Sequence, residues 1–294
     1  MTPIKNLLIG DNAFIGVSHL SHAKARDRLQ RLNVEKIVEV IRTAISCGAN
    51  GFTFTVHPTN IEVLKELISS QSLNSSFTLY PTLPYAAGYL RTMNEKGIVG
   101  TLGELFDQVS ILDNARLLFG GGVQSLTGDP IGVMKSYVNH ELSRIPKGAN
   151  IRSVLLHDVV TDLAVSYRSV DVIQSYIENI QNKWHAAPGF VTRNFSRFVE
   201  FFNQMGWRLS DVVVMSPFNR IGFQMNPSKE LCEASLSKLE NGRVIAMSIM
   251  AGGYLTLEDA LDYIQGLRNL YGITLGVSTQ KHAAEAFARL SAKR

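Results

Sequence analysis

Short runs of apolar, mostly β-branched residues alternate along the chain with longer segments in which apolar residues recur every three to four positions. The longer segment at 34–47 carries one apolar stripe, with Asn33 placed to cap its start and Gly48 to end it. The short runs predict nine strands, at residues 7–10, 51–56, 77–82, 116–119, 152–157, 189–191, 212–216, 243–249 and 273–277. Such regular alternation predicts a parallel sheet covered by helices.

Capping residues mark the start of several of the predicted helices. Asp129-Pro130 and Asn226-Pro227 each place a capping residue before a proline at the first helical position. Asn194 and Thr256 each precede a further helical segment. The helices therefore begin directly after the predicted strands or their short loops.

The order of elements predicts one α/β domain, a (β/α)8 TIM barrel that spans residues 1–294. No Pro-, Ser- or Gly-rich stretch is long enough to separate two domains. Nine strand candidates are one more than such a barrel needs, so one of them lies outside it. An open doubly wound sheet is the alternative, although no glycine fingerprint follows residues 7–10 to support dinucleotide binding of that type.

Composition narrows the class of ligand. Of the 294 residues, 45% are hydrophobic and 18% charged, enough apolar material for a large core. The formal charge is +4, and Lys and Arg are spread along the chain, which suits a small anionic ligand and gives no footprint for nucleic acid. No apolar run reaches the roughly 20 residues that cross a bilayer, and the start of the chain does not read as a signal peptide. These features predict a cytoplasmic protein with a small-molecule ligand.

The second half of the chain resembles the aldo-keto reductases. Residues 153–157 (SVLLH) resemble the fourth strand of that family, which ends in a histidine, and residues 188–195 (PGFVTRNF) are similar to the next strand with its GxSNF ending. Residues 212–219 (VVVMSPFN) resemble the following strand, which ends in an aromatic–Asn pair. Residues 243–255 and 273–279 are similar to the seventh strand and to the last strand with its nucleotide-phosphate loop. The resemblance implies an aldo-keto-reductase-like barrel and makes NADP or NAD the candidate cofactor.

The spacing in that family, counted back from His157, places the third barrel strand near 116–122 and makes residues 77–112 an extra strand–helix unit. The family works with an Asp, a Tyr as general acid, a Lys and a His. Here the second strand ends in Thr-Phe-Thr-Val-His57, residues 116–122 contain no Lys, and Met215 replaces the usual Gln against the nicotinamide. His157 is the one member of the set that matches.

Polar residues gather where the predicted strands end, which is where barrels carry ligand chemistry. Polar groups at the ends of apolar strands need partners or a ligand. The set comprises Asp11, Asn12, His57, Tyr80, His157, Asp158, Arg193, Asn194, Asn219, Arg220 and Ser278.

Three of these residues are candidates for acid/base catalysis. His157, followed by Asp158, is the first, because a histidine at the end of a strand can exchange a proton near neutral pH. His57 could donate a proton in place of the Tyr of the family, or cap the loop before Pro58. Asp11 could be a general base or a loop cap. Because side chains alternate along a strand, His157 is expected to face the pocket and Asp158 to point the opposite way if the strand continues.

Glycine-containing turns after the last two strands predict a phosphate site. Such turns, beside a helix N-terminus, present backbone N–H groups to an anion, although glycines also serve tight turns alone. The residues are Gly252, Gly253, Gly276, Ser278, Thr279 and Lys281. Two long loops, 11–32 and 84–103, are candidate lids.

Three functions remain open from the sequence. The first is an enzyme of aldo-keto-reductase descent that acts on a small carbonyl compound, with oxidoreductase as its candidate class. The second is a lyase, aldolase or isomerase that keeps only the phosphate site. The third is a catalytically silent ligand-binding barrel. No metal-type spacing ties the His, Asp and Cys residues together, so no metal is expected.

Overall fold

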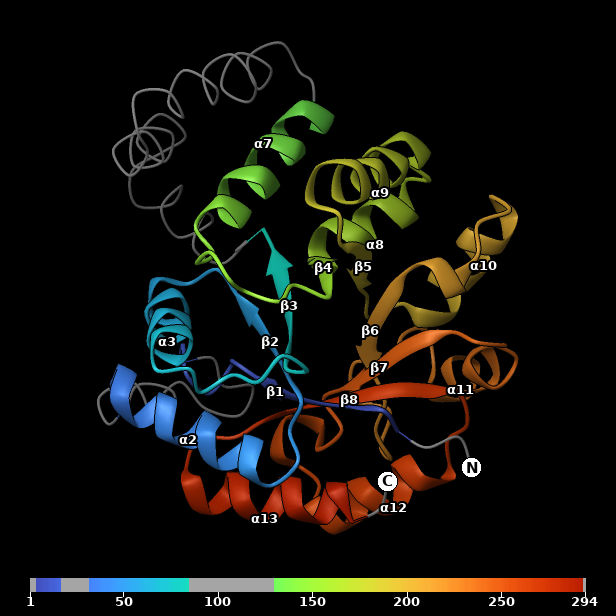
Figure 1. Ribbon diagram of the computed structural model, residues 1–294. Helices are drawn as coiled ribbons and strands as arrows, with labels where there is room; N and C mark the ends of the chain where they lie inside the picture. Colours follow the sequence, from blue (N-terminus) through green and yellow to red (C-terminus); the bar gives the residue numbers. More distant parts are fainter. Residues whose placement is uncertain (1–3, 17–31, 85–129, 293–294) are drawn as a thin grey trace, which may run out of the picture.

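The computed structural model describes residues 4–16, 32–84 and 130–292, and it shows a closed barrel of parallel strands in sequential order (Figure 1). Each strand pairs with the next one in the chain, and the last pairs with the first. The strands are β1 Asn6–Gly10, β2 Gly51–Thr55, β3 Thr78–Leu83, β4 Ser153–Leu156, β5 Ala187–Val191, β6 Val213–Pro217, β7 Arg243–Met247 and β8 Leu270–Gly276. The predicted (β/α)8 barrel is confirmed.

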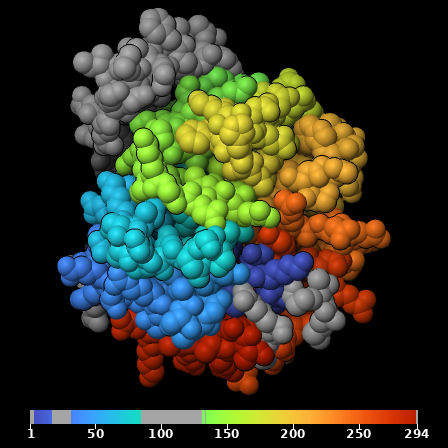
Figure 2. All heavy atoms as spheres, viewed as in Figure 1, coloured from blue at the N-terminus to red at the C-terminus, as the bar shows by residue number. Residues whose placement is uncertain are grey.

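Helices cover the outside of the barrel (Figure 1). Those described are α2 Val34–Ser46, α3 Pro58–Ser69, α7 Pro130–Ser143, α8 Asp158–Ser166, α9 Val170–Trp184, α10 Phe195–Gln204, α11 Lys229–Ser237, α12 Leu257–Gly266 and α13 Gln280–Ser291, with short 3₁₀ turns η2 Leu209–Asp211 and η3 Ala251–Gly253. The last helix, α13, packs against α2, so the layer of helices ends beside the place where it began (Figure 2). None of these described helices is long and apolar enough to cross a bilayer.

Alternating side chains divide the core into two clusters. Outward-facing strand residues pack under the helices in the larger cluster. Inward-facing ones fill the barrel, and this smaller cluster consists of Leu8, Tyr80, Leu155, Val191, Val213, Met215 and Ile245. The strands read as apolar on both faces for this reason.

Two of the predicted caps, Asn33 and Thr256, form their hydrogen bonds; Asn194 occupies the N-cap position of α10 without one, and Asp129 lies outside the described residues. Asn33 accepts a hydrogen bond from the amide of Lys36 at 3.0 Å, and Thr256 accepts one from the amide of Asp259 at 3.1 Å. The prediction that the helix after β6 begins at Pro227 is wrong. Its N-cap is Ser228, whose hydroxyl accepts from the amide of Leu231 at 3.3 Å, so α11 begins two residues later.

The third barrel strand is also misplaced in the sequence prediction. β3 Thr78–Leu83 pairs with both β2 and β4, so residues 77–82 form part of the barrel and not an extra unit. Residues 116–122, where the third strand was expected, lie outside the described residues, as does most of both candidate lids. Counting back from His157 failed because a long stretch, residues 84–129, separates β3 from α7.

Candidate functional site

His157 and Arg193 follow the C-terminal ends of two neighbouring strands, β4 and β5. Leu155 and Val191 point into the barrel, and His157 comes directly after β4, whereas Arg193 comes two residues after the end of β5. The chain keeps its strand pairing up to this point, because the amide of His157 donates to the carbonyl of Leu83 at 2.7 Å. Both side chains therefore belong to the mouth of the barrel.

One carboxylate joins these two side chains. His157 Nδ1 lies 2.7 Å from Asp158 Oδ1, and Arg193 Nε lies 2.5 Å from Asp158 Oδ2. The amide of Val159 donates both to His157 Nδ1, at 3.3 Å, and to Asp158 Oδ1, at 3.0 Å, so His157 is the N-cap of α8. Nδ1 of His157 therefore faces two partners, the Val159 amide and the Asp158 carboxylate. Neither contact uses Nε2, the other ring nitrogen.

Asp158 is ionised in this arrangement. Burial by itself raises the pKa of its carboxyl group, but the hydrogen bond and charge of His157 and the charge of Arg193 outweigh burial and hold the pKa below its usual value. Its side chain is 9% exposed, whereas those of His157 and Arg193 are 24% and 42% exposed. The buried negative charge of Asp158 thus lies against two more exposed side chains, His157 and Arg193.

A second carboxylate, Asp162, fixes the backbone of Arg193. It accepts hydrogen bonds from Thr192 Oγ1 at 2.5 Å and from the amide of Arg193 at 3.1 Å, and burial raises its pKa. Sequence reasoning missed Asp162 and Thr192. The available signal was the spacing of Asp158 and Asp162, which are four residues apart and share one face of α8.

The expectation that His157 and Asp158 point to opposite faces applied to a strand that continues through Asp158, and the strand does not continue. The strand ends at Leu156, and Asp158 is the first residue of α8. The chain turns at His157, so the side chains of His157 and Asp158 come together and form the ion pair described above. The alternation of strand side chains no longer applies once a helix begins.

Asp11 and His57 serve the structure around β1, β2 and α3. Asp11 Oδ2 accepts three hydrogen bonds at 2.8 Å, from the amide and hydroxyl of Thr55 and from Asn60 Nδ2. Burial raises the pKa of Asp11. His57 is the N-cap of α3, where its Nδ1 accepts from the amide of Thr59 at 3.2 Å. Asn12 is exposed in the turn after β1. The contacts of Asp11 and His57 thus differ from those expected of catalytic groups at the mouth.

Other predicted rim residues also have structural partners. Asn219 is buried and holds its own loop, since its amide group donates to the carbonyl of Phe223 at 2.8 Å and accepts from the amide of Phe223 at 2.7 Å. Arg220 pairs with Asp259 at 3.0 Å. Asn194 occupies the N-cap position of α10. Tyr80 lies inside the barrel and not at the rim, and burial raises its pKa to about 12.

The predicted phosphate residues lie at the ends of β7 and β8. Gly252 and Gly253 have positive φ, of 71° and 106°, and the amide of Gly253 donates within its own turn to the carbonyl of Met250 at 2.8 Å. After β8, Gly276 is exposed, Ser278 is half-buried, and Thr279 caps α13 by accepting from the amide of His282 at 3.2 Å. Lys281 is exposed in the first turn of α13. These residues after β8 therefore lie at the N-terminus of α13.

The seam between β1 and β8 holds a buried hydroxyl close to two glycines. Gly10 and Gly276 are partners in the strand register. Thr274, two residues before Gly276 and paired with Leu8, has a buried hydroxyl with no hydrogen-bond partner among the described residues. A Cβ on Gly10 would lie 3.3 Å from that hydroxyl. An orphaned polar group beside two bare glycines fits the approach of a bound group.

Two further features lie outside this arrangement. Within the described ranges, no three His, Cys, Asp or Glu side chains are grouped as they would be to hold a metal ion.

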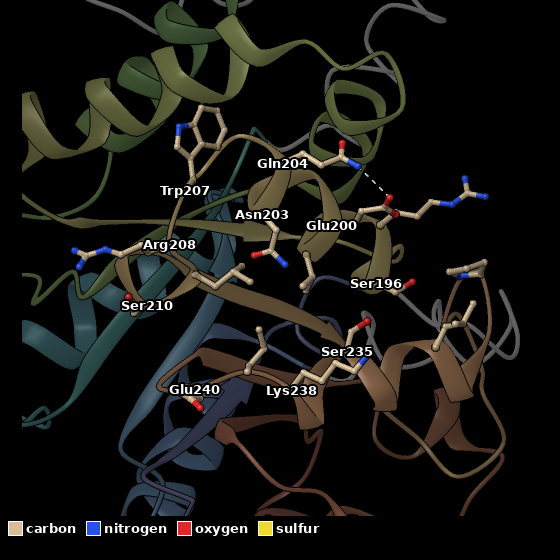
Figure 3. A pocket seen from close by; sticks show the side chains of 16 residues that line it. Ser196, Glu200, Asn203, Gln204, Trp207, Arg208, Ser210, Ser235, Lys238 and Glu240 are labelled. Carbon is tan, nitrogen blue, oxygen red and sulfur yellow. Dashed lines mark hydrogen bonds between the residues drawn. The ribbon is translucent and has the colours of Figure 1, made fainter.

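A groove of about 1040 Å³ runs between α10 and α11 on the outside of the barrel (Figure 3). It is lined by polar side chains such as Glu200, Gln204 and Lys238, and none of the residues predicted from the sequence is among its lining. The groove is distinct from the strand ends.

Comparison with solved structures identifies the fold. Two structures described as putative aldo-keto reductases from Pseudomonas aeruginosa match 99% of this chain and 91% of their own, with TM-scores of 0.59 and 0.60 at 12% and 10% identity. A putative 2,5-diketo-D-gluconic acid reductase B matches 98% of this chain and 82% of its own, with a TM-score of 0.55 at 11% identity. No protein-family model and no curated protein matches the sequence. The chain therefore has the (β/α)8-barrel fold of the aldo-keto reductases.

Proposed function

We propose that this barrel is an enzyme that acts on a small anionic carbonyl compound, with His157 as the group that gives or takes a proton. The contact that carries the proposal is the one between His157 Nδ1 and Asp158 Oδ1, at 2.7 Å, directly after the end of β4. A carboxylate that holds the Nδ1 proton leaves Nε2 free to exchange a proton with an oxygen of the substrate. Asp158 keeps that tautomer and stabilises the imidazolium ion that forms when Nε2 accepts a proton.

A nicotinamide nucleotide, NADP or NAD, fits the opposite side of the mouth as a cofactor and would supply hydride when bound. Gly276, Ser278, Thr279 and Lys281 would hold one of its phosphate groups at the N-terminus of α13. The hydroxyl of Thr274, which has no partner among the described residues, lies close to Gly10 on the same side of the barrel and could donate to a bound group. These residues would bind and orient the nucleotide, and His157 would give or take the proton.

A second candidate function is a lyase, aldolase or isomerase that uses the same histidine and the phosphate site without a nucleotide. The observation in its favour is the position of Tyr80, which lies inside the barrel and not at the mouth, together with the absence of the family's Asp–Tyr pair after β2. A positioned general acid contributes about 10²- to 10⁴-fold, so ordinary nicotinamide-dependent reduction of a generic aldehyde is expected to be very slow.

The test replaces His157 and follows the fate of the substrate. Purified protein is incubated with glyoxylate, pyruvate and glyceraldehyde 3-phosphate, with and without NADPH or NADH. Proton NMR follows the carbonyl compound, and absorbance at 340 nm follows the nucleotide. We expect turnover of one of these compounds, and His157→Gln should lower it about 10²-fold or more. Change in the carbonyl compound without nucleotide identifies the second candidate function.

The matched control is His185→Gln. His185 is exposed at the C-terminal end of α9, before β5, at the opposite end of the barrel from His157. Both variants should melt within a few degrees of the wild type, because neither side chain contributes to the core. Equal turnover per folded molecule in His157→Gln and the wild type, or no turnover of any of the three compounds, would contradict the proposal.

A further inference from the structure

His157 and Arg193 are neighbours because one carboxylate holds both of them. Oδ1 of Asp158 receives His157, and Oδ2 receives Arg193. The imidazole and the guanidinium group therefore lie against the two oxygens of one buried side chain. Hydrogen bonds to Asp162 also fix the backbone at Arg193. The pair is therefore preorganised by the ends of β4 and β5 and by the first two turns of α8.

Each of these two side chains has nitrogen atoms that form no hydrogen bond with the described residues. The Nε of Arg193 forms an ion pair with Asp158 without the alignment of a hydrogen bond. The structure gives neither terminal NH₂ group of Arg193 a partner among the described residues, and the side chain is 42% exposed. Nε2 of His157 also has no hydrogen-bond partner among the described residues. The terminal NH₂ groups of Arg193 and Nε2 of His157 thus belong to two side chains that are held by one carboxylate.

We infer that the site takes a small carboxylate with an oxygen on the adjacent carbon, such as a 2-oxo or 2-hydroxy acid. The two carboxylate oxygens would accept from the terminal NH₂ groups of Arg193, a planar pairing that suits a guanidinium group. The neighbouring keto or hydroxyl oxygen then lies at His157 Nε2. This inference rests on the proposed function, because it identifies the substrate of the same site.

The surroundings favour a short apolar remainder on this substrate. Val191 and Met215 fill the barrel next to Arg193, and their side chains are 5% and 6% exposed. They offer an apolar floor and no further cation. A phosphate dianion would need more donors than the single guanidinium group provides, and the predicted phosphate residues lie on the β7–β8 side.

The test measures binding and requires no turnover. Isothermal titration with oxalate and with pyruvate is compared with methyl pyruvate, the neutral ester of the same keto acid. We expect the wild type to bind both anions and to bind the ester at least tenfold more weakly. Arg193→Gln should weaken the binding of both anions about tenfold to a hundredfold, because it removes a charged pair of hydrogen bonds. Arg193→Lys should fall between the two, since it keeps the charge and loses the planar pairing.

The control is Arg208→Gln, which removes an exposed arginine that pairs with Asp211 before β6, away from the mouth. It should bind the anions as the wild type does. Undiminished oxalate binding by Arg193→Gln, absence of anion binding in the wild type, or equal binding of pyruvate and its ester would each overturn the inference. Thermal unfolding of each variant confirms that it is folded.

The same variants separate this inference from the proposed function. If anions bind through Arg193 but His157→Gln turns over substrate like the wild type, the inference stands and the role of His157 as proton donor or acceptor fails. If His157→Gln abolishes turnover while Arg193→Gln leaves pyruvate binding unchanged, the proposed function stands and the carboxylate subsite is wrong.

Discussion

At the scale of single residues, two buried carboxylates at the strand ends respond to burial in opposite ways. Asp158 has a cation and a histidine against it, and its pKa lies below the usual value in spite of burial. Asp11 accepts only from neutral groups, Thr55 and Asn60, and burial raises its pKa. Charge on the partners decides the difference, because neutral donors recover less of the lost hydration than a cation does.

Asp158→Asn tests the first of these environments. A carboxyl group with a lowered pKa stabilises the fold above its unfolded value of 3.8, and that contribution is lost as the pH falls through the folded pKa. We expect the variant to lose about 1–3 kcal/mol of unfolding free energy at pH 7, and the gap to the wild type to narrow below pH 3.8. Urea unfolding across this range measures it. Asp211→Asn, which breaks an exposed pair with Arg208, should cost less than about 1 kcal/mol.

Asp11→Asn should have a pH dependence of the opposite sign. A carboxyl group with a raised pKa contributes most to stability below its unfolded value of 3.8, and that contribution is lost as the pH rises through the folded pKa. The wild type should therefore lose stability relative to the variant as the pH rises over this interval. The same urea series measures it. A constant difference between Asp11→Asn and the wild type at all pH values would show that Asp11 has an ordinary pKa.

At the scale of elements, two helices begin with the same cap but serve different parts of the barrel. Thr279 caps α13 and Thr256 caps α12, each by accepting from the amide three residues later. Only α13 begins at the predicted phosphate residues. The two threonines therefore separate the loss of a cap from the loss of an anion site.

Thr279→Ala and Thr256→Ala should each lower the unfolding free energy by about 1 kcal/mol. Inorganic phosphate and NADP⁺ should raise the melting temperature of the wild type and of Thr256→Ala, and should do so less for Thr279→Ala, whose first helical turn is less ordered. The measurement is thermal unfolding with and without each anion. Equal stabilisation of both variants would place the anion site away from α13.

At the scale of the whole molecule, closure of the barrel depends on how closely its strands approach inside. A Cβ added to Gly51 would lie 2.5 Å from Leu8 Cδ2 and 2.7 Å from the carbonyl oxygen of Thr78, so all three first strands would have to shift. Gly266, at the end of α12, has no atom within 4 Å of an added Cβ. The two glycines thus differ in what an added Cβ would meet.

Gly51→Ala should lower the unfolding free energy by about 1–3 kcal/mol, the usual cost of overpacking, because the clash includes backbone that belongs to the closed sheet. Gly266→Ala should be neutral or stabilise by up to about 1 kcal/mol. Chemical unfolding followed by both far-ultraviolet circular dichroism and tryptophan fluorescence measures both effects. A wild-type free energy for Gly51→Ala would mean that β1, β2 and β3 are packed more loosely than described.

The sequence by itself determined the features that depend on neighbours along the chain. Apolar periodicity gave the alternation of strands and helices, and short-range hydrogen bonding gave the caps at Asn33 and Thr256. It also placed His157 at the end of a strand. Each of these follows from interactions within about four residues, which a single sequence records directly.

Only the tertiary structure decided which distant residues meet. It made residues 78–83 the third strand, because pairing with β2 and β4 depends on register and not on spacing in the chain. It turned Asp11 toward Thr55 and Asn60, and it brought Arg193 to Asp158 across two strands. Contacts between β4 and β5 span more than 30 residues, and closure of the barrel fixes them all at once. The carboxylate that joins His157 to Arg193 is therefore visible only in the folded chain.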